Sequence, residues 1–252
     1  MKQRTMNGKR LAILALVLFL ASLIWNLPAS FVWSHIKDRL PAQVELSGLT
    51  GTLWTGRVNR IEADGVDQGS LAWTWRPTGL LTAAIELDLL WKPRKGDVRA
   101  TLQVGTDTLT LENVRGQLDA AAMASINKAP FLLEGTWQLD VPVLELQDME
   151  HVTRADGRLI WDSAAGGLPT ALALGNLVAD LADSEGWLQF TLSDQGGPLG
   201  LEGTARWRPG QAMVLDTRLQ ARATAEAGLV GGLSLLGKPA ADGWISWRAR
   251  LQ

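Results

Sequence analysis

The segment GSLAWTW at Gly69–Trp75 decides the fold class of this chain. In a β-strand, residues two positions apart lie on one face, so Gly69, Leu71 and Trp73 share a face and the residues between them share the other. A glycine at the start of a strand permits a bulge or a tight turn. A tryptophan buries a large ring there, while its indole N–H can reach a backbone carbonyl. The segment therefore predicts a strand with one buried face.

The same pattern, glycine followed by an apolar residue and then tryptophan at alternate positions, recurs along the chain. It appears at Gly157–Trp161, Gly203–Trp207 and Gly243–Trp247, and in shortened form at Gly51–Trp54 and Gly135–Trp137. Two interpretations remain open. These are either the hairpin signals of any β protein or copies of a duplicated unit that builds one long sheet. Their irregular spacing does not support a propeller or a strict solenoid.

Alternation of apolar and polar residues continues from Val44 to the end of the chain, as in Ile85–Leu89. Such alternation indicates strands with one wet face. Asp119–Lys128 is expected to form a short helix with Asp119 as its N-cap, whereas Ala223–Leu236 is ambiguous because three glycines interrupt it. The predicted fold is mainly β: a transmembrane helix and then a long, twisted antiparallel sheet, sandwich-like or an open groove, with one or two short helices.

The N-terminus differs from the rest of the chain. Residues 1–10 contain four basic residues and no acid, and residues 11–30 are almost entirely apolar. About 20 helical residues cross a bilayer, and basic residues favour the cytoplasmic side. We therefore expect a cytoplasmic N-terminus (1–10), a transmembrane helix (11–30) bordered by Trp25 and Trp33, a juxtamembrane linker (31–43) and a periplasmic β domain (44–252). The alternative is a cleaved signal peptide, but Leu27 occupies the place of a small residue.

Composition excludes several classes of protein. The 252 residues include no cysteine, two histidines and 12 tryptophans. Disulfides, thiolate nucleophiles and cysteine-ligated zinc are therefore ruled out. Without the four N-terminal bases, 20 Lys and Arg face 26 Asp and Glu, so the chain lacks the basic surface of a nucleic-acid binder.

No residues are expected to be catalytic or to bind a metal or a cofactor. The candidates are His35, His151 and the acidic pairs Glu62/Asp64, Asp148/Glu150 and Asp180/Asp183. Solvated histidines and chance pairing of acids explain these residues, and no small-molecule substrate is expected. The repeated tryptophans are interpreted as core, while a sugar- or lipid-binding surface stays open.

Three motifs, in this order after the apolar N-terminal stretch, resemble the type II secretion system protein N family. They are LTGTLWTG at Leu49–Gly56, GSLAW at Gly69–Trp73 and LLGKPAADG at Leu235–Gly243, whose motif residues are Gly51, Trp54, Gly56, Gly69, Trp73, Gly237, Pro239 and Gly243. The resemblance implies a non-enzymatic, single-pass inner-membrane subunit of a machine that exports folded proteins from the periplasm through an outer-membrane secretin. Its partners would be the inner-membrane bilayer and other subunits of that system. The family brings no catalytic residues.

Two other functions remain as alternatives. A sheet with an apolar face, anchored at the inner membrane, could shield or transport lipid in an open groove. A periplasmic glycan hydrolase would instead need two carboxylates that converge in a cleft. An open sheet also leaves edge strands, which makes pairing with a partner strand a hypothetical docking mode.

Overall fold

The computed structural model describes residues 8–36, 44–63, 65–82, 84–122 and 132–251. Within these ranges the named helices and strands follow one another in the order α1 (Gly8–Trp25), α2 (Ala29–Ile36), β1 (Val44–Ser47), β2 (Thr50–Gly51), β3 (Thr55–Ala63), β4 (Val66–Arg76), the 3-10 helix η2 (Pro77–Thr82), β5 (Ile85–Lys92), β6 (Gly96–Val104), β7 (Thr108–Asp119), β8 (Leu132–Gln147), β9 (His151–Gly167), β10 (Leu172–Ser184), β11 (Trp187–Asp194), β12 (Leu199–Trp207), β13 (Met213–Ala221), α3 (Ala227–Leu236) and β14 (Ile245–Leu251).

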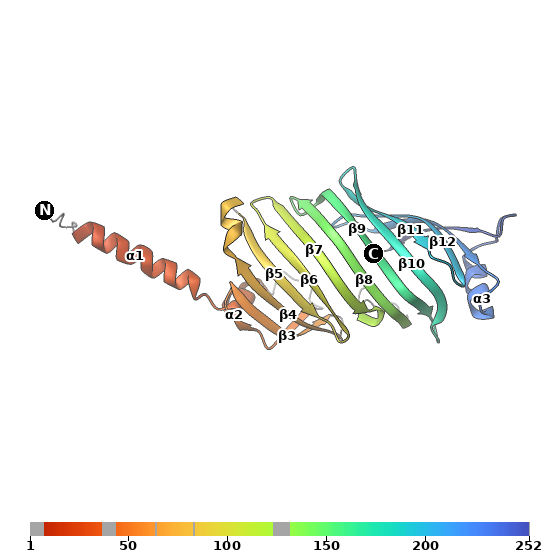
Figure 1. The fold of residues 1–252 in the computed structure, drawn as a ribbon, viewed down its shortest axis with the longest axis horizontal. Helices are drawn as coiled ribbons and strands as arrows, with labels where there is room; N and C mark the ends of the chain where they lie inside the picture. The colour runs from red at the N-terminus through yellow and green to blue at the C-terminus, as the bar shows by residue number, and fades with distance from the viewer. Residues whose placement is uncertain (1–7, 37–43, 64, 83, 123–131, 252) are drawn as a thin grey trace.

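The strands form one sheet in which, from β3 onward, each strand pairs with the next strand in the sequence. The order runs from β1 through β3 to β14, and the short β2 pairs with β3 beside β1. Every pairing is antiparallel, from β1 with β3 to β13 with β14. Figure 1 shows the resulting row of tilted strands, with α1 extending from its N-terminal end. The predicted long antiparallel sheet with few short helices is confirmed.

The register separates the residues into an apolar face and a charged face. On the apolar face Trp73 lies opposite Leu89, and Trp137 opposite Trp161. On the charged face Arg158 lies opposite Asp180. The predicted sharing of one face by glycine, apolar and tryptophan positions is confirmed in the register at Gly157–Trp161 and Gly203–Trp207, whereas Gly243 precedes β14 and Trp54 lies in a turn. The apolar face includes Leu71, Trp73, Trp75, Leu89, Trp91, Trp137, Leu159, Trp161, Leu177, Leu181, Phe190, Ala205, Trp207, Leu219, Ile245 and Trp247.

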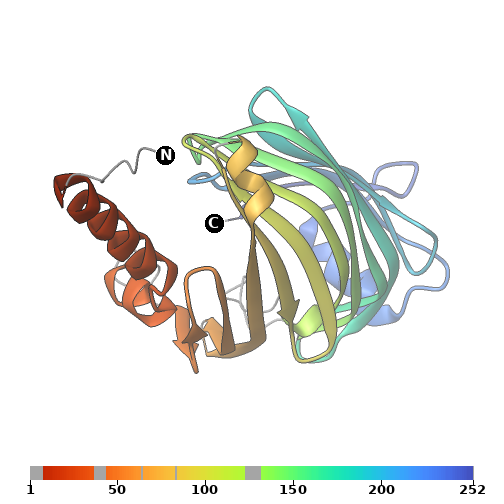
Figure 2. The same cartoon turned by 60° about the vertical axis from the view of Figure 1, so that its left-hand side comes forward.

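The sheet curves around its apolar face. One core cluster joins Val141 of β8, Leu181 of β10 and Leu188 of β11, and Leu109 of β7 and Trp207 of β12 pack against it. Figure 2 shows that the sheet curves around α3, whose Leu229 and Leu233 pack against Leu177 and Leu219 of the apolar face. Burial of these side chains is the main stabilising contribution to a sheet that has no second sheet against it.

Helix α3 covers the C-terminal end of the apolar face. Its two buried residues, Leu229 and Leu233, are one helical turn apart and pack in a cluster with Leu177, Leu199 and Leu219. The helix occupies Ala227–Leu236, which resolves the ambiguous segment Ala223–Leu236 as helical in its second part.

The predicted transmembrane helix over residues 11–30 requires correction. In the described part of the chain, no helix has the length and apolarity needed to span a membrane. Helix α1 ends at Trp25, and α2 begins at Ala29, inside the predicted span. Pro28 gives the physical reason, because a proline disfavours helical backbone in the residue before it. Asn26 closes the end of α1 by donating its side-chain N–H to Ser22 O at 2.8 Å.

The predicted helix Asp119–Lys128 is described only at its start. Asp119 is the last residue of β7, and its carboxylate accepts the backbone N–H of Ala121 at 3.0 Å. Residues 120–122 form a single 3-10 turn. The rest of the predicted helix lies outside the described residues.

Candidate functional site

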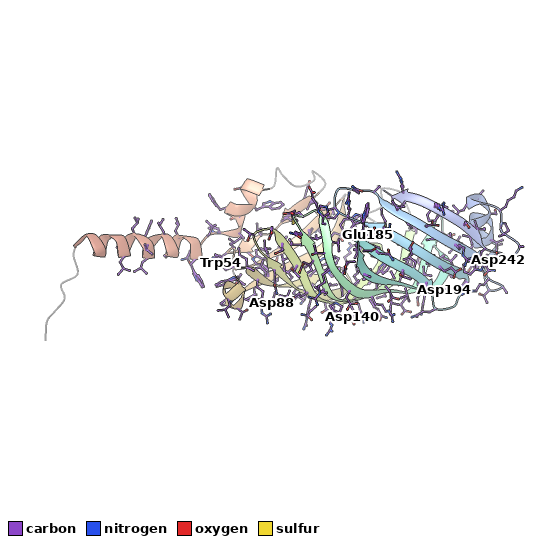
Figure 3. All side chains as sticks on the ribbon, turned by 90° about the horizontal axis from the view of Figure 1, so that it is seen from above. Trp54, Asp88, Asp140, Glu185, Asp194 and Asp242 are labelled. Carbon is purple, nitrogen blue, oxygen red and sulfur yellow. The ribbon has the colours of Figure 1, made fainter. Side chains whose placement is uncertain are left out.

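The first five motif residues gather at the N-terminal end of the sheet. Gly51 of β2 lies opposite Gly56 of β3, and Gly56 lies opposite Trp73 of β4. Trp54 lies in the turn between β2 and β3 and is labelled in Figure 3. Gly69 lies near the start of β4. Residues that are 22 positions apart at most are thus brought to one corner of the sheet by two consecutive hairpins.

Gly56 makes room for the ring of Trp73. A Cβ atom at Gly56 would lie 2.5 Å from Cζ2 of Trp73. The ring therefore lies across the backbone of β3, and its Nε1 donates a hydrogen bond to Leu53 O at 3.0 Å. This contact holds the β2–β3 turn on β4.

Gly69 allows a second contact of the same type. Its φ is +81°, and a Cβ atom there would lie 2.0 Å from Lys92 O. The preceding carbonyl, that of Gln68, accepts the indole N–H of Trp91 at 2.7 Å. Gly135 repeats the arrangement with φ +103°, since the preceding Glu134 O accepts Nε1 of Trp161 at 2.9 Å. The glycine and tryptophan of the repeat thus join neighbouring strands.

A tryptophan cluster, consisting of Trp25, Trp54 and Trp75, attaches the end of α1 to the sheet. The ring centroid of Trp25 lies 6.2 Å from that of Trp54 and 5.6 Å from that of Trp75. The ring centroids of Trp54 and Trp75 are 5.0 Å apart. Next to the cluster, the backbone N–H of Leu53 donates to Leu27 O at 3.0 Å. Trp25, which the sequence places at a membrane border, is 59% exposed and contacts the sheet through one side of its ring.

The remaining motif residues shape the chain between α3 and β14, at the other end of the sheet. Gly237 follows the last residue of α3, and Pro239 lies just beyond it. The backbone N–H of Ala240 donates to Trp244 O at 2.8 Å, which closes a turn around Gly243. Gly243 has φ +82°, a conformation that favours glycine. This group directs the chain from α3 into β14 and does not approach the first five motif residues.

The charged face carries a row of cross-strand ion pairs. Arg115 lies opposite Asp140, which lies opposite Arg158 on the next strand. Nε of Arg115 lies 3.1 Å from an oxygen of Asp140, and Nε of Arg158 lies 2.6 Å from an oxygen of Asp180. The hydrogen bond to Asp180 raises the pKa of Arg158. These ion pairs are exposed to solvent, so each adds little to the stability of the fold. They favour this register of the strands and keep this face of the sheet soluble.

The carboxylate of Asp194, at the end of β11, is largely buried, with 8% of its side chain exposed. Arg222 donates to both of its oxygens, at 2.5 and 3.1 Å, and the backbone N–H groups of Leu201 and Gly196 donate at 2.9 Å. Burial raises the pKa of Asp194, but these hydrogen bonds outweigh it and hold the pKa below its ordinary value. The sequence gives no signal for this pair, whose members are 28 residues apart.

The histidines and acidic pairs considered from the sequence do not converge in the described residues. His151 is exposed at the start of β9, and the side chain of His35 lies outside the described ones, as does Asp64. Asp180 bonds Arg158 on the charged face, whereas Asp183 bonds Ala155 N–H from the apolar face. Within the described ranges no group of three or more His, Cys, Asp or Glu could hold a metal ion.

The apolar face is covered unequally along the sheet. Leu177, Leu199 and Leu219, at the end covered by α3, are buried. From β4 to β7 many apolar-face residues are only half-buried, including Leu71, Trp73, Trp75, Leu87, Leu89, Trp91, Leu102, Leu109 and Leu111. This part of the concave face can accept further apolar contacts.

Comparison with known proteins agrees with the motifs. A model of the family described as type II secretion system (T2SS), protein N, matches residues 42–248. Type II secretion system protein N of Vibrio cholerae serotype O1 (strain ATCC 39315 / El Tor Inaba N16961) is 28% identical over 171 residues, which are 66% of this chain and 67% of the relative. The protein of the same name from Aeromonas hydrophila is 35% identical over 96 residues, 38% of this chain and 36% of the relative.

No solved structure matches the chain. The family match extends from just before β1 into β14 and therefore includes both groups of motif residues. The chain belongs to the type II secretion system protein N family.

Proposed function

We propose that this chain is a non-enzymatic subunit of the type II secretion system that supports export of folded proteins from the periplasm. The observation that carries the proposal is the family match over residues 42–248, which covers nearly the whole sheet. The proposed role is to contact other envelope subunits through the sheet. The uncovered part of the apolar face and the sheet edges are the surfaces available for such contacts.

We further propose that α1 attaches the protein to the inner membrane and that the sheet lies in the periplasm. The large apolar residues described on α1 surround the helix and are between 46% and 64% exposed: Leu14, Leu16, Val17, Leu18, Phe19, Leu20 and Leu23. A helix that is apolar on all sides needs an apolar environment, and the sheet does not supply it.

Membrane attachment is tested by extraction of isolated envelopes with alkaline carbonate. The wild type is expected in the pellet, and a Leu16→Glu/Leu20→Glu variant in the supernatant. The control places two glutamates on the charged face of the sheet, Gln189→Glu/Ser246→Glu, opposite Arg206 and Arg218, and stays in the pellet. Release of the wild type together with soluble periplasmic markers would contradict membrane attachment.

The secretion role is tested by deletion and complementation in the source bacterium. The deletion strain is expected to retain exoproteins in the periplasm, and the full chain is expected to restore their export. Normal export by the deletion strain would argue against an essential role. Affinity capture from cross-linked envelopes then identifies the neighbouring subunits. Single cysteines are suitable cross-linking sites because the natural chain has none.

A second candidate function, shielding of lipid acyl chains, is favoured by the half-buried leucines and tryptophans between β4 and β7. Their side chains form an apolar surface on the inside of a curved sheet, as a lipid groove requires. Purification in mild detergent followed by mass spectrometry is the test. Stoichiometric co-purified lipid would favour this function, and its absence would refute it.

A further inference from the structure

Strand β14 ends the sheet with an edge to which no described strand pairs. It pairs with β13 on one side only, over Ile245–Leu251. The opposite edge is formed by the much shorter β1 (Val44–Ser47) and β2. An edge strand presents a row of backbone N–H and C=O groups that can pair with an added strand. With seven residues, β14 is long enough to hold such a strand in one register.

We propose that the outer edge of β14 binds an extended segment of another protein in which apolar and acidic residues alternate. The proposal names the edge through which this chain would make one of its contacts in secretion, and the chemistry of that contact. For the identity of the partner it rests on the proposed secretion role. The two faces of β14 and the pattern of charge across the sheet lead to it.

The inner face of β14 is apolar. Ile245 lies opposite Leu219, and Trp247 lies opposite Thr217 on the concave side of the sheet. Ala249 and Leu251 continue the same face at alternate positions. An added strand would extend this face, and its side chains there would contact Trp247 and its neighbours. Its inward positions are therefore expected to be apolar.

The outer face of β14 is basic. Arg248 and Arg250 point to the charged face together with Ser246. Arg248 is 81% exposed and forms an ion pair with Asp216 of β13 at 2.9 Å. Arg250 has no ion pair among the described residues, and its cross-strand neighbour is Val214, beyond which lies Arg206. On the outer side of β14, where no described strand pairs, neither Arg248 nor Arg250 has an acid opposite it.

The row of charges across the sheet indicates what belongs opposite these arginines. Arg99 of β6 lies opposite Arg115, and from Arg115 onward the row alternates to Asp140, Arg158 and Asp180 on successive strands. After two threonines it continues with Asp216 and ends with Arg248 at the edge. An acid opposite Arg248 on an added strand would continue the alternation. Opposite charges at facing positions stabilise a strand pair, and like charges destabilise it.

The same rule disfavours β14 of a second copy as the occupant. An antiparallel pair centred on Arg248 would place the two Arg248 side chains opposite each other. β1 of a second copy has an acid at Glu45 but only four residues. Association of the chain with itself through these edges is therefore a measurable alternative outcome.

The test uses the full chain in mild detergent and fluorescence anisotropy with labelled synthetic peptides. The probe is a blocked Val-Glu-Val-Glu-Val-Glu-Val peptide, and Val-Lys-Val-Lys-Val-Lys-Val is its comparison. The acidic peptide is expected to bind and the basic one is not. A third peptide, with the acidic sequence and N-methyl groups on alternate amides, lacks the backbone donors for pairing and is expected not to bind.

The protein variant is Arg248→Glu/Arg250→Glu, and its matched control is Arg115→Glu/Arg158→Glu in the middle of the charged face. The edge variant is expected to bind the acidic peptide at least about tenfold more weakly and to gain binding of the basic peptide, while the control is unchanged. Equal binding of both peptides by the wild type, equal loss in the control, or binding of the N-methyl peptide would overturn the proposal. A self-associated wild type that the edge variant dissociates would assign the edge to a second copy instead.

Secretion assays separate this proposal from the secretion role. If the deletion strain exports normally but the acidic peptide binds as expected, an essential secretion role fails and the edge proposal stands. If the edge variant restores export fully and binds the peptide like the wild type, the edge proposal fails while the secretion role stands.

Discussion

Replacement of Gly69 by alanine tests the Gly–Trp contacts that join the strands. The backbone at Gly69 has φ +81°, which costs an alanine about 1 kcal/mol. Its Cβ would lie 2.0 Å from Lys92 O, so the β4 and β5 backbones must separate locally, at a cost of about 1 kcal/mol or more. That movement also weakens the 2.7 Å bond from Trp91 Nε1 to Gln68 O, worth about 1 kcal/mol. Gly69→Ala should therefore destabilise the protein by about 3 kcal/mol in total.

Gly65 supplies a matched control from the same hairpin. It has a similar φ of +76°, but no described atom lies within 4 Å of where its Cβ would be. Gly65→Ala therefore carries the backbone strain alone, about 1 kcal/mol. The difference between the two variants isolates the close approach of β4 to β5.

Urea unfolding of the full chain in mild detergent, followed by tryptophan fluorescence, measures both variants. The Gly69→Ala midpoint is expected to fall well below that of Gly65→Ala, with the same dependence on urea. If the two variants unfold at the same urea concentration, the close contact at Gly69 does not contribute and the reasoning is refuted.

Three further predictions concern the buried carboxylate and the stacked tryptophans. Asp194→Ala should cost about 2–3 kcal/mol because it removes the acceptor of Arg222 and of the backbone N–H groups of Leu201 and Gly196, whereas the exposed Asp216→Ala should cost less than about 1 kcal/mol in the same urea assay. The lowered pKa of Asp194 stabilises the fold above the ordinary aspartate value of about 4, and this stabilisation is lost as the pH falls through the lowered pKa. An unfolding series from pH 7 to 3 should show this loss in the wild type and less of it in Asp194→Ala. Trp161→Phe should cost about 1 kcal/mol by removing the bond to Glu134 O, while Trp137→Phe removes a buried N–H that has no partner among the described residues and should cost less in a thermal melt.

Much of the sheet could be predicted because its rules are local. Alternation at Ile85–Leu89 and the Gly-x-Leu-x-Trp spacing at Gly69–Trp73 fix which residues share a face, and the register confirms both. The order of the strands was not predicted, and the structure shows that from β3 onward it follows the sequence. The choice between a sandwich and an open sheet depends on what packs against the apolar face, and the alternation within each strand does not show that α3 packs on Leu177, Leu199 and Leu219 of three different strands.

The contacts outside the repeat could not be predicted. Trp25 packs against Trp54 and Trp75 because the chain turns back after α1, and only the position of Pro28 hinted at a break in the helix. The motif residues also form two separate groups, at β2–β4 and after α3, rather than one site. The order of the motifs along the chain does not show how far apart the two groups lie in the structure.

Pairing only between sequence neighbours has a consequence for how this protein responds to partners. Each strand depends on the two beside it, so local stability follows local burial, much as in repeat proteins. The β10–β14 end is buried under Leu229 and Leu233 of α3, whereas Leu71 and Leu89 in β4–β5 are only half-buried. Binding of lipid or protein to the inner face at β4–β7 would therefore stabilise that end selectively, while a strand added at β14 would protect β13 and β14. Hydrogen exchange measured along the chain distinguishes these two sites of binding, because slowed exchange would appear at opposite ends of the sheet.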